Sequence, residues 1–445
     1  MKLNTKRTLL VGLAFFTIQA IWQMYNTEVP LMLEKMLSDT EATIFHAAKT
    51  TVINFIMTID NILALFMLPL FGVLSDKTHT RIGKRMPYIL VGTAFSVTFL
   101  ILMPIFYAID SFIGFFLMLG GLLLAMSVYR SPAVALMPDV TPKPLRSKAN
   151  ALINLMGAAG MILILVATMV IGKIADGKLF YIVLFTFCGV MVVAAITAMY
   201  FSIDENQLLS EMPDDEPETE EERMHREGKG IHIHATVKTS LVFLLIAVAM
   251  WYMAYGCIET NFSRYAVNNL GMNESTKAIP MLVATGASLI GFVPLGVLSS
   301  KIGRKKMVMI GVGVLTLAAL VGSFATNLIV LYILFAFIGV SWAAINVNSY
   351  PMVVEMAKGA DIGRYTGYYY TFQTAAQIAT PLFSGLLIDV FESVFKSAFN
   401  QDGLGMKVLF PYSVVFLVLA LIAMLFVKHG DSKETDIQKL KETTN

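Results

Sequence analysis

Two ionisable side chains lie deep inside long apolar segments, and they are the best candidates for chemistry in this sequence. Asp60, followed by Asn61, lies near the middle of one segment, and Arg130 is the only basic residue wholly inside another. A charge at the centre of a bilayer costs about 2.5 to 3.5 kcal/mol, so such groups usually face a protein interior or a water-filled cavity and have a function. Asp60 could pair with Arg130, and its carboxyl group is the best candidate for carrying a proton.

An aromatic pair followed by a carboxylate occurs twice, once in each half of the chain. The two sets are Trp22, Tyr25 and Glu28, and Trp251, Tyr255 and Glu259. Spacings of three and four residues place each set on one face of a helix. Because a carboxylate is costly against lipid, we expect both faces to point into a helical bundle, with Glu28 and Glu259 as further proton-coupling candidates. The alternative is that both acids lie near the membrane surface, among aromatic residues of the interfacial belt.

Amide and aromatic side chains in the same segments suggest a binding cavity for a hydroxyl-rich solute. Sugar hydroxyls need amide or carboxylate partners, and the apolar C–H faces of a sugar pack on aromatic rings. The candidate substrate-binding residues are Gln19, Trp22, Gln23, Tyr25, Asn26, Asn61, Asn154, Trp251, Tyr255, Trp342, Asn346, Gln373 and Gln377. Each amide could instead join helices by hydrogen bonds, and the 28 methionines also suit a pocket for amphipathic drugs.

The elements that must position these residues are membrane-spanning helices. Hydrophobic residues make up 56% of the 445 residues, and charged residues only 14%. Crossing about 30 Å of hydrocarbon takes roughly 20 apolar residues per helix. Twelve such segments begin near Thr8, Ala47, Met86, Asp110, Ser147, Leu179, Ser240, Glu274, Met307, Leu328, Asp361 and Val408. We therefore predict an all-α integral membrane protein with twelve transmembrane helices.

A basic turn between two apolar segments recurs half a chain later. Residues 72–87 read GVLSDKTHTRIGKRMP, and residues 296–306 read GVLSSKIGRKK. Two homologous halves of a helical bundle are typical of secondary transporters, so we expect two pseudo-symmetric six-helix halves. The hydrophilic stretch after the sixth segment is too charged to bury a core. The predicted parts are an N-terminal half over residues 1–205, a cytoplasmic linker over 206–238, a C-terminal half over 239–430 and a cytoplasmic tail over 431–445.

Lysine and arginine are distributed unevenly between the two ends of these segments. With the amino terminus inside, the inner connections carry 24 of the 33 basic residues and the outer ones carry 8. The positive-inside rule then predicts a multi-pass protein of the cell membrane with both termini in the cytoplasm. The net charge of +2 gives no basic footprint for nucleic acid, and a monomer in the lipid bilayer is expected.

Motifs for ATP use and for hydrolysis do not occur in the sequence. There is no GxxxxGK[ST] phosphate loop, no HExxH and no GxSxG. His232 and His234 lack a spaced third ligand, so no metal site and no cofactor are expected. We therefore predict that the chain is not an enzyme, and an ion-coupled secondary carrier remains.

The basic turn, its partial repeat and the twelve segments resemble the major facilitator superfamily over essentially the whole chain. More narrowly, Asp60-Asn61, the turn at 72–87 and the stretch 130–150 resemble bacterial relatives of sucrose:proton symporters, within the glycoside:cation symporter group. This resemblance implies two six-helix halves that rock about a central site. It also implies a cytoplasmic gate, for which the matching residues are Gly72, Asp76, Arg81, Gly83, Arg85, Asp139, Arg146, Glu355 and Arg364.

Three departures from the family pattern bear on gating and coupling. Ser300 replaces Asp76 in the second copy of the turn, so the second half of the gate is expected to be weaker. Plant sucrose carriers have an acid upstream of the arginine, whereas residues 119–129 contain none, which moves the expected proton site to Asp60. Sodium-coupled members use two acids one turn apart, but Ile56 and Ala64 flank Asp60 at that spacing, so H+ is favoured over Na+.

These observations predict a secondary active transporter that imports a sugar, a disaccharide or a glucoside, together with protons by alternating access. The proton gradient is then its energy source. The alternative is a proton-driven exporter of drugs, metabolites or sugars, which would show counterflow and a broad apolar ligand range. A membrane sensor or an enzyme would need a signalling domain or a catalytic constellation, and the chain offers only short tails and a linker.

Overall fold

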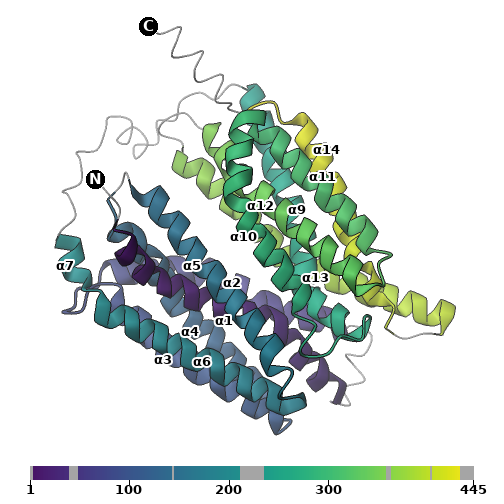
Figure 1. The fold of residues 1–445 in the computed structure, drawn as a ribbon, viewed down its shortest axis with the longest axis horizontal. Helices are drawn as coiled ribbons and strands as arrows, with labels where there is room; N and C mark the ends of the chain where they lie inside the picture. The colour runs from purple at the N-terminus through teal and green to yellow at the C-terminus, as the bar shows by residue number, and fades with distance from the viewer. Residues whose placement is uncertain are drawn as a thin grey trace. The chain divides into compact units, whose positions relative to one another are not determined.

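The computed structural model describes residues 4–39, 49–142, 145–210, 235–356, 362–400 and 403–430. In these residues the chain forms helices joined by short turns, and no strands (Figure 1). The helices of the first half are α1 (Thr5–Asp39), α2 (Lys49–Asp76), α3 (Met86–Ala108), α4 (Phe112–Asp139), α5 (Arg146–Ile171), α6 (Gly177–Ser202) and the short α7 (Glu205–Ser210). Those of the second half are α9 (Ala235–Asn268), α10 (Ile279–Ile302), α11 (Arg304–Gly322), α12 (Leu328–Glu355), α13 (Ile362–Phe399), the 3-10 helix η4 (Gly405–Val408) and α14 (Leu409–Phe426).

Twelve spans in the described residues are long and apolar enough to cross a membrane, which confirms the predicted number. One predicted start is displaced for a local reason. The eighth segment was expected to begin near Glu274, but α10 begins at Ile279. The side-chain oxygen of Asn273 accepts hydrogen bonds from the backbone N–H groups of Ser275 (3.2 Å) and Thr276 (3.1 Å). This side-chain turn competes with helix formation and delays the start of α10.

The chain divides into two compact units. Unit 1 comprises Met1–Lys49, Phe55–Asp214 and Gly271–Leu282, and unit 2 comprises Thr50–Asn54, Asp215–Leu270 and Val283–Asn445. Each unit therefore includes a short segment from the other half of the sequence. Unit 2 takes Thr50–Asn54 at the start of α2, and unit 1 takes Gly271–Leu282, which includes the start of α10.

The predicted linker and tail fall largely outside the described residues, which leave out 211–234 and 431–445. The first residues of the predicted linker belong to α7 (Glu205–Ser210). Asp204 caps this helix, because its Oδ1 accepts a hydrogen bond from the backbone N–H of Gln207 at 3.1 Å.

Glycines allow close helix packing in unit 1. A Cβ at Gly157 of α5 would lie 2.9 Å from Cγ of Gln19 on α1. A Cβ at Gly160 of α5 would meet the backbone carbonyl of Phe16, also on α1. In lipid no hydrophobic force drives helices together, so close packing of their backbones matters more, and small residues allow that close packing. This contact between α1 and α5 fixes the helix that carries Trp22, Tyr25 and Glu28.

Candidate functional site

Unit 1 gathers charged and aromatic side chains from three helices. Trp22 and Tyr25 of α1 lie edge to face, with ring centroids 5.2 Å apart and planes at 86°. The guanidinium of Arg130 on α4 lies 5.5 Å from the centroid of the Trp22 ring, within cation–π range. On α2, the amide of Asn61 donates a hydrogen bond of 2.9 Å to Oδ1 of Asp60. We call these five residues the Asp60 cluster.

Asp60 lies close enough to Arg130 and to the phenol of Tyr25 to interact with both electrostatically. The sequence indicated that Asp60 could pair with Arg130, and the two residues come from α2 and α4 of the same unit. A carboxylate beside a guanidinium can exchange its partner for a proton when the guanidinium turns to another ligand. The Asp60 cluster therefore has the groups needed to exchange a proton and to hold a polar solute.

Unit 2 contains a second set of stacked rings, on α9 and α12. Tyr255 stacks on Trp342 with centroids 3.8 Å apart and planes at 6°, and Tyr252 meets Trp342 edge-on at 5.2 Å. The hydroxyl of Tyr252 donates to Oδ1 of Asn346 at 3.0 Å. We call these four residues the aromatic cluster. Trp251, also predicted to bind substrate, is fully buried, and its ligand role stays a prediction. Tyr252 is a member of the aromatic cluster that the sequence analysis did not name.

The other predicted substrate-binding residues are scattered in environment. Gln23 is buried, and Asn154 is exposed and donates to the backbone oxygen of Asn150 at 2.8 Å. The half-buried ones are Gln19, Asn26, Gln373 and Gln377. Glu259 is also half-buried, near enough to Tyr252 and Tyr255 for electrostatic interaction. Ligand roles for all of these residues stay predictions.

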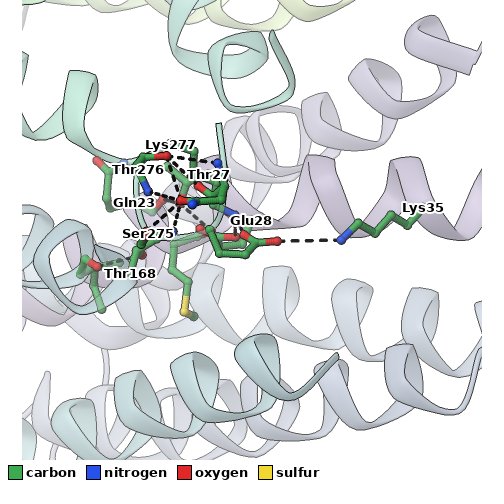
Figure 2. Close-up of polar contacts among 12 residues, drawn as sticks. Gln23, Thr27, Glu28, Lys35, Thr168, Ser275, Thr276 and Lys277 are labelled. Atoms are coloured by element: carbon green, nitrogen blue, oxygen red, sulfur yellow. Dashed lines mark hydrogen bonds and ion pairs between the residues drawn. The ribbon is translucent and has the colours of Figure 1, made fainter. Parts of the chain in front are cut away.

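Glu28 belongs to a buried ion cluster that the sequence did not reveal. The ammonium of Lys277 pairs with Oε2 of Glu28 at 2.6 Å (Figure 2). It also pairs with Glu274. The side chains of Glu28 and Lys277 are 0% and 2% exposed, and that of Glu274 is 18% exposed. We call these three residues the Glu28 cluster. Lys277 is one of the eight basic residues in the predicted outer connections, and the signal for its burial in the sequence is Glu274, an acid three residues before it.

The first basic turn is held by a network around Arg85. Its Nε donates to Oδ2 of Asp139 at 2.9 Å, and its terminal nitrogens donate to Asp76, to Ser75 and to the carbonyl of Gly72 (3.2 Å). Lys84 adds a 3.0 Å ion pair with Asp139. Four of the predicted gate residues, Gly72, Asp76, Arg85 and Asp139, therefore meet in one network.

Glu205 is a further member of this region that sequence reasoning missed. Its buried carboxylate accepts hydrogen bonds from the backbone N–H groups of Lys84 (3.0 Å), Arg85 (2.9 Å) and Met86 (2.9 Å), at the start of α3. A carboxylate suits a helix N-terminus because unpaired N–H groups and the helix dipole are both positive there. Gly83 precedes them with a φ of 112°, and a Cβ at this position would collide with Glu205.

Arg81 does not join the network through its side chain, which is exposed. Its backbone carbonyl accepts a hydrogen bond of 2.9 Å from Asn206, on α7. Arg146 and Arg364 lie in α5 and α13, but their side chains are outside the part of the chain that the structure describes.

The second basic turn repeats part of this arrangement in unit 2. Gly303 has a φ of 99°, and Arg304, which follows it, pairs with Glu355 at the end of α12. The ammonium of Lys305 donates to the carbonyl of Val427 at 2.6 Å. Among the described residues of both units, no group of three or more His, Cys, Asp or Glu side chains could hold a metal ion.

Comparisons with known proteins agree with this architecture. The family described as MFS/sugar transport protein matches residues 42–357. The MFS-type transporter ppzB of Metarhizium rileyi (strain RCEF 4871) is 25% identical over 156 residues, which cover 33% of this chain and 32% of that relative. The match thus spans about a third of the length of this curated relative.

Solved structures of transporters share the fold along nearly the whole chain. A D-xylose-proton symporter superposes with a TM-score of 0.69 and 13% identity, covering 96% of this chain and 98% of that one. The POT family transporter PepTSo gives a TM-score of 0.65 and 12% identity, covering 96% and 98%. With the family match over most of the sequence, these results show that the chain belongs to the MFS/sugar transport protein family and is a multi-pass membrane transporter.

Proposed function

We propose that this transporter imports a sugar, a disaccharide or a glucoside, together with protons, and that Asp60 carries the coupled proton. The observation that carries the proposal is the Asp60 cluster. It puts a carboxylate within electrostatic reach of a guanidinium, beside an aromatic ring, in helices of unit 1 that span the membrane. A carboxylate in this setting can be neutralised either by the base or by a proton, and substrate can decide between the two.

The aromatic cluster supports a sugar as the solute. Flat rings such as those of Tyr255 and Trp342 suit the apolar C–H faces of a pyranose, and the amide of Asn346 offers hydroxyl partners. In the Asp60 cluster, Trp22 and Asn61 supply the same two kinds of contact. A neutral sugar needs no fixed counter-charge, so the role of Asp60 and Arg130 in this proposal is to handle the proton.

The site of action that fits this role is the cell membrane, with both termini in the cytoplasm and a monomer as the working unit. The basic turns after α2 and α10 then face the cytoplasm, in keeping with the positive-inside rule. The acid–base networks around Arg85 and Arg304 would act there as the two halves of a gate that opens as the protein alternates.

The test is proton flux coupled to sugar entry. De-energised cells that express the protein, in lightly buffered medium, are given a panel of disaccharides, glucosides and monosaccharides while external pH is recorded. We expect one class of sugar to alkalinise the medium, and a protonophore to abolish the signal. Asp60→Asn should abolish this signal but retain exchange of labelled sugar across the membrane, because exchange needs no net proton movement. Asp110→Asn is the matched control, since it removes an exposed carboxylate paired with Lys178.

Two results would contradict the proposal. Sugar binding without any proton movement would point to sodium coupling or to uniport. Expulsion of apolar compounds against a proton gradient, with no response to sugars, would make the protein an exporter.

A further inference from the structure

The Glu28 cluster joins α1 to a segment whose chain continues into unit 2. Residues Gly271–Leu282 pack within unit 1, although α10, which begins at Ile279, continues from Val283 as part of unit 2. Any change that detaches this segment from unit 1 therefore acts directly on the start of α10.

Close packing holds the segment in unit 1. At Gly172, just after α5, a Cβ would lie 2.6 Å from the carbonyl carbon of Glu274 and from the nitrogen of Ser275, so only glycine leaves room for this backbone. The ammonium of Lys277 lies 5.0 Å from the ring centroid of Phe180 and 5.7 Å from that of Tyr181, on α6. Aromatic faces favour a cation at this distance.

The charge of Lys277 makes this packing depend on Glu28. A buried ammonium is stable only with a well-placed partner, and loss of one partner of a buried pair is strongly destabilising. Glu274 is a second partner, but its side chain is 18% exposed and it lies on the same segment as Lys277. Of the two acids in the cluster, only Glu28 belongs to the first half of the sequence and holds Lys277 to α1.

Glu28 also has an oxygen ready for a proton. Its Oε1 is fully buried and has no hydrogen-bond partner among the described residues. The charged or titratable groups facing Glu28 are Lys277, Glu274, Lys35 of α1 and the phenol of Tyr181 of α6. A proton on Oε1 would neutralise the carboxylate that binds Lys277 and leave the ammonium to Glu274 alone.

We propose that the Glu28 cluster is a proton-operated latch, in which protonation of Glu28 releases Lys277 and with it the segment Gly271–Leu282 from unit 1. Lys277 keeps its charge and its pair with Glu274 as the two leave together. The latch rests on the proposed function in one respect: it would give proton-driven transport a second protonation step, separate from that of Asp60. Lys277 acts as a positioning residue and touches no substrate.

The test is thiol accessibility of the segment in the absence of substrate. Ala278, next to Lys277, is 3% exposed and is replaced by cysteine in a protein whose buried Cys188 and Cys257 are changed to alanine. The purified full chain is placed in lipid nanodiscs, so that both faces are open to a maleimide reagent. Rates are divided by those of a reference cysteine at Ala175, also buried and in unit 1 but outside the segment.

We expect the normalised rate at position 278 to rise roughly tenfold, the effect of about 1.4 kcal/mol, as the pH falls from about 8 to about 5. Glu28→Gln, which mimics the protonated acid, should give the high rate at every pH. The double variant Glu28→Gln with Lys277→Met removes both buried charges and should give a low rate at every pH. Asp389→Asn is the matched control: Asp389 accepts hydrogen bonds from Thr50 and Thr51 at the start of α2, in unit 2, and its loss should leave the pH response intact.

A normalised rate that ignores pH in the protein with native Glu28 would overturn the latch, and this result needs no variant of Glu28 to fold. Equal acceleration at positions 278 and 175 would overturn it too, because it would mean general loosening of unit 1. No sugar is present, so the latch can fail while Asp60-dependent proton flux is observed. Conversely, the labelling rate at position 278 could respond to pH in a protein that moves no sugar. That result would refute the proposed function and leave the latch standing.

Discussion

The turn between α2 and α3 and the turn between α10 and α11 make the same sharp reversal of the chain but carry different charged residues. Each has a glycine with positive φ, 112° at Gly83 and 99° at Gly303. In each, the next residue is a base that pairs with the acid ending a later helix: Lys84 with Asp139, and Arg304 with Glu355. The sharp reversal and one ion pair are thus common to both halves.

The difference lies in the carboxylates around this shared frame. Helix α6 is followed by the extended residue Ile203, and two residues later comes Glu205. Helix α14 is followed by the extended residue Val427, and two residues later comes His429. Glu205 binds the N-terminus of α3, whereas the Nδ1 atom of His429 lies 2.9 Å from the hydroxyl of Ser240 at the start of α9. The comparison teaches that the helical frame needs only the glycine and the ion pair, and that additional acids fix the first turn more firmly.

The largest expected effect comes from removing the acid that has no counterpart in unit 2. Glu205→Ala leaves the N–H groups of Lys84, Arg85 and Met86 without their acceptor. Hydrogen bonds to a charged group contribute about 1.5 to 3 kcal/mol each, so the loss should be about 3 kcal/mol or more. Thermal unfolding of the purified protein in detergent measures it.

His429→Ala is the control for that substitution, because it stands at the corresponding place after α14. A midpoint lowered equally by both variants would remove the asymmetry between the two turns.

A smaller and graded effect is expected at the two glycines. Alanine at either position would be held at a positive φ that residues with a Cβ rarely adopt, which costs roughly 1 to 3 kcal/mol. Gly83→Ala should be the more damaging, because its Cβ would also collide with the side chain of Glu205. Unfolding midpoints of Gly83→Ala and Gly303→Ala compare the two, and the double variant Gly83→Ala with Glu205→Ala should recover part of the difference. Without that recovery, the collision would not be the cause.

The acids at the ends of α4 and α12 come next. Asp139 holds both Lys84 and Arg85, while Glu355 pairs with Arg304, and both carboxylates are partly exposed. Asp139→Asn should therefore lower stability by about 1 kcal/mol, the scale of a partly screened pair. Glu355→Gln should lower it no more than that. High salt should shrink both effects, and urea or thermal unfolding at two salt concentrations measures this.

The sequence predicted the frame well, because its physical causes are local. Each span needs a continuous apolar run, and a repeated turn leaves a repeated string of glycines and bases, so the twelve helices and both turns were predicted. The sequence also offered a pairing of Asp60 with Arg130 as a possibility, because isolated charges in apolar helices seek partners. On α9 the sequence pattern pointed to Trp251 and Tyr255, whereas the rings that contact Trp342 are those of Tyr252 and Tyr255, since helical spacing alone does not distinguish adjacent residues at the edge of a face.

The contacts that the sequence did not predict depend on tertiary packing of loop residues. Lys277 lies in a polar connection whose composition is that of an ordinary exposed loop, yet its side chain is buried where this connection packs on Gly172. Glu205 is the last residue of the predicted N-terminal half and adjoins the charged linker, so nothing in the sequence marked it as a buried acceptor. No periodicity marks such residues, because their partners lie far away in the sequence.

The smallest expected effect concerns Asp76 and its counterpart Ser300, and it separates stability from gating. The side chain of Asp76 is 56% exposed, so its pair with Arg85 should contribute well under 1 kcal/mol. Asp76→Asn should barely move the unfolding midpoint, since Asp139 and Ser75 still hold Arg85. Ser300→Asp, which supplies the acid missing from the second turn, should raise the midpoint by as little.

If these acids serve the gate, the two substitutions should still shift the rate of sugar exchange, and in opposite directions, because an ion pair that breaks on opening changes a barrier more than it changes stability. Exchange rates that follow the unfolding midpoints would instead make Asp76 a minor structural residue, and the asymmetry of the turns would then reside in Glu205 alone.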